Sequence, residues 1–125
     1  MKTLNKEKIK NLSFEDFNVE KMIFSNNEKT LRIFVDGAWF ISNDISQLGK
    51  GILFFNDWER LTINRYNPNT EEWSTINELT IEPLQDICEM KFFDSTICLY
   101  GFGKKIGYWM EWKIYKTKIR AEFDS

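Results

Sequence analysis

The stretch that decides the fold class is residues 108–123, Tyr-Trp-Met-Glu-Trp-Lys-Ile-Tyr-Lys-Thr-Lys-Ile-Arg-Ala-Glu-Phe. Apolar and polar side chains alternate along it, with the period of a β-strand that buries one face. The apolar set changes parity on the way, from Tyr108, Met110, Trp112 and Ile114 to Tyr115, Ile119, Ala121 and Phe123. Because a period of two changes sides only where a residue is inserted, the stretch predicts one long strand with a β-bulge near Ile114-Tyr115.

Shorter stretches of the same kind precede it. Apolar side chains alternate over 31–35 and 58–66, and segments 84–93 and 96–102 form a predicted hairpin. Residues 26–29 and 67–70 are turn clusters, 42–51 reads as a loop, and a return strand is expected from Trp73 toward Ile81. The sequence predicts an all-β fold of about eight mostly antiparallel strands. We expect a meander that forms a sandwich or an open curved barrel, with little helix.

The chain of 125 residues has the length of one domain. Residues 1–12 are predicted to form a basic N-terminal tail, which is either frayed or forms one helical turn. Residues 13–125 are predicted to form a single β domain. Aromatic residues make up 16% of the chain, which favours pleated, half-buried surfaces.

Charge is unevenly distributed along the chain, whose net charge is −2. Residues 1–10 carry a net +3, residues 11–103 a net −8 and residues 104–120 a net +5. An acidic body suits a basic partner, although such asymmetry also serves to keep a surface hydrated.

Cys88 and Cys98 are the two cysteines. If 93–96 closes a two-residue hairpin, Cys98 faces Lys91 and the two sulfurs are offset along the strands, which is poor disulfide geometry. We therefore expect reduced, buried thiols and a cytoplasmic protein. The first residues lack the apolar stretch of a signal peptide, and no apolar run approaches the length that spans a membrane.

The chain lacks the residues that most catalytic sites and metal sites require. The chain has no histidine, which excludes Ser-His-Asp and Cys-His sites, and two cysteines cannot supply a structural zinc site. Gly49-Lys50-Gly51 lacks the other residues of a phosphate loop. We expect no cofactor, no metal and no catalytic residue. A pair of carboxylates that acts as a hydrolase stays open, because sequence does not give their separation.

The basic residues of the last stretch have two interpretations. Lys113, Lys116, Lys118 and Arg120 are interleaved with aromatic residues, as in sites for single-stranded nucleic acid. Lysines also protect edge strands from aggregation, and the pI near 5.3 favours this interpretation.

The tryptophans and acidic residues indicate where a partner would bind. Trp58, Trp109 and Trp112 are expected in the core or at its rim, whereas Trp39 and Trp73 lie beside turns and are expected to be partly exposed. An exposed aromatic beside carboxylates is a plausible hot spot. The predicted partner-binding residues are Trp39, Glu71, Glu72, Trp73, Glu78 and Glu82.

Three segments carry a resemblance to a group of proteins. Residues 13–19 (Ser-Phe-Glu-Asp-Phe-Asn-Val), 84–103 and 109–112 (Trp-Met-Glu-Trp) resemble small bacterial all-β proteins of the toxin-immunity-protein type. The resemblance covers both ends of the chain and transfers no functional residue.

The leading hypothesis is a non-catalytic cytoplasmic domain that binds a basic protein partner by occlusion, as an immunity protein or inhibitor does. The alternatives are a β domain that binds a small ligand or glycan, a carboxylate-only hydrolase, and a subunit that dimerises through an edge strand. No membrane association is expected.

Overall fold

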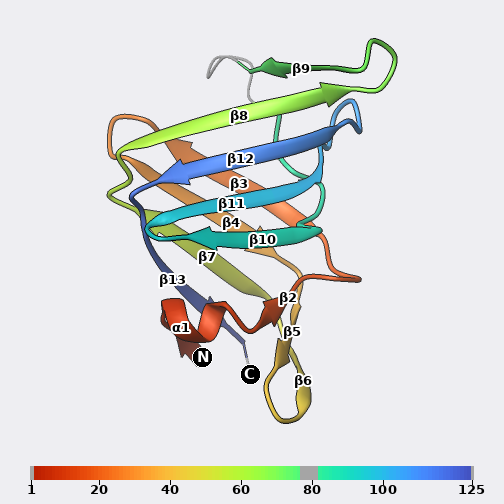
Figure 1. Cartoon of the computed structure of the whole chain (residues 1–125). Helices are drawn as coiled ribbons and strands as arrows, with labels where there is room; N and C mark the ends of the chain where they lie inside the picture. The colour runs from red at the N-terminus through yellow and green to blue at the C-terminus, as the bar shows by residue number, and fades with distance from the viewer. Residues whose placement is uncertain (1, 77–81, 125) are drawn as a thin grey trace.

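A computed structural model describes residues 2–76 and 82–124 and confirms the all-β fold (Figure 1). The described part contains thirteen strands, all antiparallel to their neighbours, and one short helix, α1 (Lys6–Ile9). A small sheet consists of β2 (Leu12–Ser13), β5 (Ala38–Ile41) and β6 (Ile45–Leu48). The other ten strands form two five-stranded sheets.

The front sheet has the order β10 (Glu89–Phe93), β11 (Thr96–Phe102), β12 (Trp109–Tyr115), β8 (Arg60–Asn67) and β9 (Glu72–Thr75). The back sheet has the order β1 (Lys2–Leu4), β13 (Lys118–Phe123), β7 (Gly51–Asn56), β4 (Thr30–Val35) and β3 (Val19–Ser25). Figure 1 shows the front sheet crossing over the back sheet, so the fold is a sandwich.

Alternation along the strands builds one core between these layers. In β12 the even residues Met110, Trp112 and Ile114 are buried, and in β4 the odd residues Leu31, Ile33 and Val35 are buried. Each fully buried side chain of this size contributes about 1.5–3 kcal/mol relative to an exposed one. Side chains from both large sheets and from α1 belong to the same buried cluster.

The predicted bulge at Ile114-Tyr115 is wrong, although the change of parity is real. β12 ends at Tyr115, and β13 begins at Lys118 in the other sheet. Lys116 takes a left-handed conformation with φ 53°, and the Thr117 hydroxyl donates to the Asn56 carbonyl at 3.3 Å. Two corner residues therefore turn the chain from one layer into the other, which changes the buried parity without a bulge.

A second crossing runs beside this one. The chain leaves β7 in the back sheet and enters β8 in the front sheet through Asp57, whose φ is also 53°. Lys116 pairs with Glu59 at 3.1 Å and Lys118 pairs with Asp57 at 3.2 Å across the two crossings. The predicted meander therefore describes only part of the topology, because hairpins such as β10–β11 alternate with crossings between layers.

Residues 2–12 do not form a frayed basic tail, whereas the alternative of one helical turn is confirmed by α1. β1 pairs with β13, α1 follows it, and Leu4 and Ile9 are fully buried in the core. The expected loop at 42–51 is also partly wrong, because β6 lies within it and pairs with β5. Both segments are short, and their apolar residues are too few to show a period.

The interpretation of the last stretch as a protected edge is wrong. β12 lies between β11 and β8, and β13 lies between β1 and β7. Lys113 and Lys118 lie on the outward faces of interior strands, and Lys116 lies at the corner between them. The hairpin register is as predicted, with Phe93 opposite Thr96 and Lys91 opposite Cys98.

Both thiols are free, as predicted, and Cys98 is buried. Cys88 is exposed, contrary to the prediction, because it precedes β10 instead of lying inside a strand. None of the helical structure described is long and apolar enough to cross a bilayer.

Candidate functional site

The outward face of the front sheet carries an unusual set of aromatic side chains, which we call the aromatic face. An antiparallel sheet with one face in water normally presents polar residues there. Trp73, Phe93 and Phe102 are instead 53%, 54% and 43% exposed. The aromatic face consists of Tyr66, Trp73, Phe93, Tyr100, Phe102, Trp109 and Tyr115. Exposed apolar surface that is rimmed by polar residues is a feature of binding sites.

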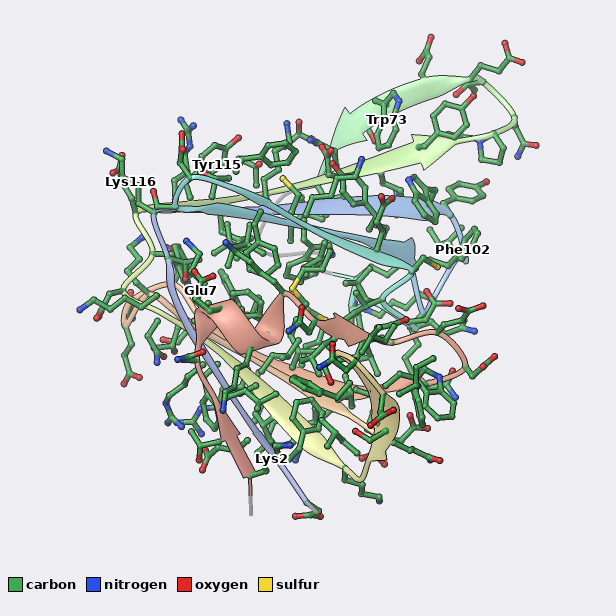
Figure 2. All side chains as sticks on the ribbon, turned by 60° about the horizontal axis from the view of Figure 1, so that its bottom comes forward. Lys2, Glu7, Trp73, Phe102, Tyr115 and Lys116 are labelled. Carbon is green, nitrogen blue, oxygen red and sulfur yellow. The ribbon has the colours of Figure 1, made fainter. Side chains whose placement is uncertain are left out.

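Rings at one end of the face pack against each other. Trp109 lies edge-on to Phe102, with ring centroids 5.1 Å apart, and stacks with Tyr100 at 6.3 Å. Trp73 on β9 leans on Tyr66, its register partner on β8, at 5.4 Å. Such pairs hold the rings in place before any ligand arrives. Figure 2 shows Trp73 on the β8–β9 hairpin and Phe102 on the same side of the molecule.

The other end of the face is hollowed into an open groove. Tyr115 and Lys116 lie there, across the front sheet from Phe102 (Figure 2). The groove has a volume of about 630 Å³, and its walls include Arg60, Phe93, Tyr100 and Tyr115. The Arg60 guanidinium lies 4.1 Å from the centre of the Tyr115 ring. An arginine stacked on a tyrosine is a rigid contact element that combines charge with apolar area.

A polar network crosses the middle of the face. Glu111 accepts a hydrogen bond from Asn64 at 3.3 Å, and Asn64 accepts one from the Thr75 hydroxyl at 3.0 Å. Lys113 lies 3.7 Å from the Glu111 carboxylate. The network connects three neighbouring strands, β12, β8 and β9, and it supplies donors and acceptors between the aromatic rings.

The pKa values of two side chains in this region are raised. Burial raises the pKa of the Tyr100 phenol, and its hydrogen bond to Glu111 raises it further. Burial likewise raises the pKa of the Cys98 thiol. Both groups therefore stay protonated near neutral pH and act as neutral, hydrogen-bonding parts of the surface. Among residues 2–76 and 82–124, no three metal-ligating side chains cluster together.

The structure brings three of the predicted partner-binding residues together. Glu71, Glu72 and Trp73 are all exposed at the β8–β9 hairpin. Trp39 is half-buried on β5 of the small sheet, at the opposite end of the molecule in Figure 1. Its Nε1 donates to the Glu15 carbonyl at 3.0 Å, and its ring packs on Phe17. Trp39 and Trp73 therefore belong to different surfaces.

Glu82 is not a surface carboxylate, contrary to the prediction. It is 2% exposed and pairs with Arg65 at 3.3 Å. It also accepts hydrogen bonds from the backbone N–H groups of Lys105 and Ile106 at 2.8 and 2.7 Å. These internal partners engage both carboxylate oxygens, so Glu82 is left out of the binding surface. Glu78 lies outside the described residues.

Most of the aromatic face was not predicted from the sequence. Phe93, Tyr100 and Phe102 were assigned only to strands, and Tyr115 was grouped with the apolar positions of the last stretch. One signal was available in 108–115, where the aromatic residues Trp109 and Tyr115 have the parity opposite to that of the apolar residue Met110. When a strand carries aromatic residues on both faces, one set packs in the core and the other set remains available to bind a ligand.

Comparison of the chain with protein-family models, curated proteins and solved structures gave no match to any of them. The function is therefore inferred from the residues of the site itself.

Proposed function

We propose that this protein is a non-catalytic binding domain that covers the surface of another protein with its aromatic face. The observation that carries the proposal is the set of seven outward aromatic side chains on one sheet, three of them about half exposed. An immunity protein or an inhibitor works in this way, by occlusion of its target. Cytoplasmic action is part of the same proposal.

The residue types on the face support a protein partner. Protein–protein hot spots are enriched in Trp, Tyr and Arg. The face presents Trp73 and Trp109 at one end and the stacked Arg60–Tyr115 pair at the other. Neighbouring side chains already contact these groups, and all of them except Trp73 lie on interior strands, so binding orders few side chains and loses little entropy.

The acidic residues at the hairpin end support a basic partner. Glu71 and Glu72 are exposed beside Trp73, and no Lys or Arg occurs between residues 66 and 76. Exposed carboxylates around an aromatic anchor accelerate encounter with a positively charged surface and discriminate against acidic ones.

Glycan binding is the second candidate, favoured by one observation. The Trp109 and Trp73 ring pairs flank the hydrogen-bonding network of Asn64, Thr75 and Glu111. Sugars present apolar faces and hydroxyl groups that such an arrangement accommodates. Carboxylate hydrolysis is less well supported by the groove, because Glu59 and Glu111 each lie within 4 Å of a lysine.

Affinity capture with matched variants tests the proposal. Immobilised wild-type protein, Trp73→Ala and Tyr115→Ala are compared with Ile23→Ala, which removes an exposed apolar side chain from the back sheet. The captured protein is then purified, and its Kd is measured by calorimetry against all four. We expect Ile23→Ala to bind like wild type and each face variant to bind at least about tenfold more weakly.

Equal binding by all four proteins would contradict the role of the face. Binding of wild type on a glycan array, lost in Trp73→Ala, would select the second candidate. Circular dichroism of each variant shows that the fold is retained.

A further inference from the structure

The strand that carries Trp73 is also a free edge. β9 pairs with β8 on one side, and it is the last strand of the front sheet. Within the described part of the chain, no strand pairs with its other side. All four residues of β9 are exposed. An edge strand without a pairing partner among the described strands is a template for pairing with another chain.

The hydrogen-bond register shows which backbone groups of β9 face outward. The Ile76 N–H donates to the Ile63 carbonyl at 2.8 Å, one step beyond the pairing of Thr75 with Asn64. Bonded and non-bonded pairs alternate along an antiparallel ladder. Arg65 and Ser74 are therefore a bonded pair, and Trp73 and Thr75 belong to non-bonded pairs. The N–H and C=O groups of Trp73 and Thr75 thus point away from β8.

We propose that β9 binds an extended, basic segment of the partner protein by adding it as a further strand to the front sheet. This inference deepens the proposed function and depends on it. Backbone pairing with Trp73 and Thr75 supplies the hydrogen bonds, as in other cases of strand addition. The exposed Trp73 ring lies on the aromatic face beside the added strand and covers its side chains.

Charge selects the basic segment over a second copy of this chain. Two copies paired through β9 would bring two Glu71 and two Glu72 side chains to one interface, with no lysine or arginine from 66–76 to balance them. Like charges across neighbouring strands are destabilising. Lysine or arginine side chains on the added strand would instead be attracted to these carboxylates.

The opposite edge of the front sheet is less available. α1 lies beside β10 in Figure 1, the Lys6 ammonium donates to the Asp94 carbonyl at 2.8 Å, and Lys10 lies over the Phe92 ring. Edge strands with lysines around them resist pairing. β9 has no such lysine in its own sequence.

A proline substitution tests the pairing directly. Thr75→Pro removes an outward N–H and leaves the ladder to β8 intact, because proline is tolerated on an edge strand where its nitrogen faces solvent. Thr75→Val is the matched control, since it also removes the hydroxyl that bonds Asn64 but keeps the N–H. The probes are capped synthetic peptides of alternating Lys and Val, and of alternating Glu and Val.

The amide signals of Trp73 and Thr75 report binding by NMR. We expect the Lys-Val peptide to shift both signals and slow their hydrogen exchange. Thr75→Pro should weaken its affinity about tenfold and Thr75→Val less than about twofold. The Glu-Val peptide should leave the signals unchanged. Absence of these shifts at millimolar peptide, equal shifts with both peptides, or unchanged affinity in Thr75→Pro would overturn the inference.

The same variants separate this inference from the proposed function. If the captured partner binds Thr75→Pro at full strength but loses affinity for Tyr115→Ala, the role of the aromatic face is supported and strand addition is contradicted. If both variants bind at full strength, both proposals fall. A dimeric mass for wild type that becomes monomeric in Thr75→Pro would make the occupant a second copy, which contradicts the basic segment.

Discussion

Arg65 and Glu82 form an ion pair at the edge of the core, with the Arg65 Nη1 atom 3.3 Å from the Glu82 Oε1 atom. The second carboxylate oxygen accepts the N–H groups of Lys105 and Ile106. Glu82 thereby fastens the connection between β11 and β12 to β8. These three strands also carry Tyr66, Phe102 and Trp109 of the aromatic face.

Loss of this carboxylate should destabilise the fold. We expect Glu82→Ala to lower the free energy of unfolding by about 3 kcal/mol, because it leaves two backbone donors and a partly buried guanidinium without their acceptor. Glu82→Gln, which keeps acceptor capacity, should cost less. Urea denaturation measures both. The exposed Glu72→Ala should stay within about 0.5 kcal/mol of wild type, and an equal loss there would refute the special role of Glu82.

The stability of the corner at Lys116 should depend on whether the residue there adopts a left-handed backbone conformation without strain. Its φ of 53° lies in the left-handed region, where a β-branched residue is strained and glycine is not. We expect Lys116→Val to lower the melting temperature and Lys116→Gly to leave it unchanged or slightly raised. Both variants lose the same exposed ion pair with Glu59, which contributes little. Equal melting temperatures for the two variants would mean that the corner is unstrained.

Gly101 should tolerate no side chain. A Cβ at this position would lie 2.1 Å from the backbone carbonyl oxygen of Asp86. Because that atom is backbone, it cannot rotate away, and we expect Gly101→Ala to destabilise the fold by about 2 kcal/mol or more. Gly107 is the comparison, since its added Cβ would meet open space and only its φ of 84° opposes alanine. Thermal unfolding of both variants distinguishes steric from conformational cost.

Cys88 should react slowly despite its exposure. Partial burial raises the pKa of its thiol from 9.0 to about 11, and the Asp86 carboxylate, 3.6 Å from the sulfur, adds to the shift. At pH 8 the thiolate fraction is then about a hundredfold lower than for an unshifted thiol. Alkylation by iodoacetamide, followed by mass spectrometry, should be correspondingly slow and should accelerate in Asp86→Asn.

The same shift has a consequence for stability. The thiol pKa is higher in the folded state than in the unfolded state, so its contribution is fully present below pH 9 and is lost as the pH rises toward 11. Wild type should lose more stability than Cys88→Ser over this interval. Parallel stability curves for the two proteins would contradict the shift.

Much of the fold was predictable because it depends on local patterns. The alternation in 31–35 and 108–123 defines strands with one buried face, and the register of the hairpin closed by Asp94-Ser95 follows from its loop length. The parity change in the last stretch was also visible. Its cause was not, since a bulge and a crossing between layers have the same sequence pattern.

The candidate site was less predictable, because its parts are far apart in the chain. Tyr66, Phe102 and Tyr115 meet on one face only through the order of β11, β12 and β8, which is set by pairing between distant segments. Glu82 looked like any other surface carboxylate until Arg65 and the N–H groups of Lys105 and Ile106 surrounded it.

By itself, the sequence determined that the chain is a β protein, where most of its turns lie and that its two thiols do not pair. These properties follow from side-chain period, turn chemistry and spacing, all of which are local. Only the tertiary structure decided that residues 2–9 join the core, that Trp39 and Trp73 lie on separate surfaces, and that one sheet presents an aromatic face with a free edge. Burial and proximity depend on which strands become neighbours, and the pairing of strands is determined by interactions along the whole chain.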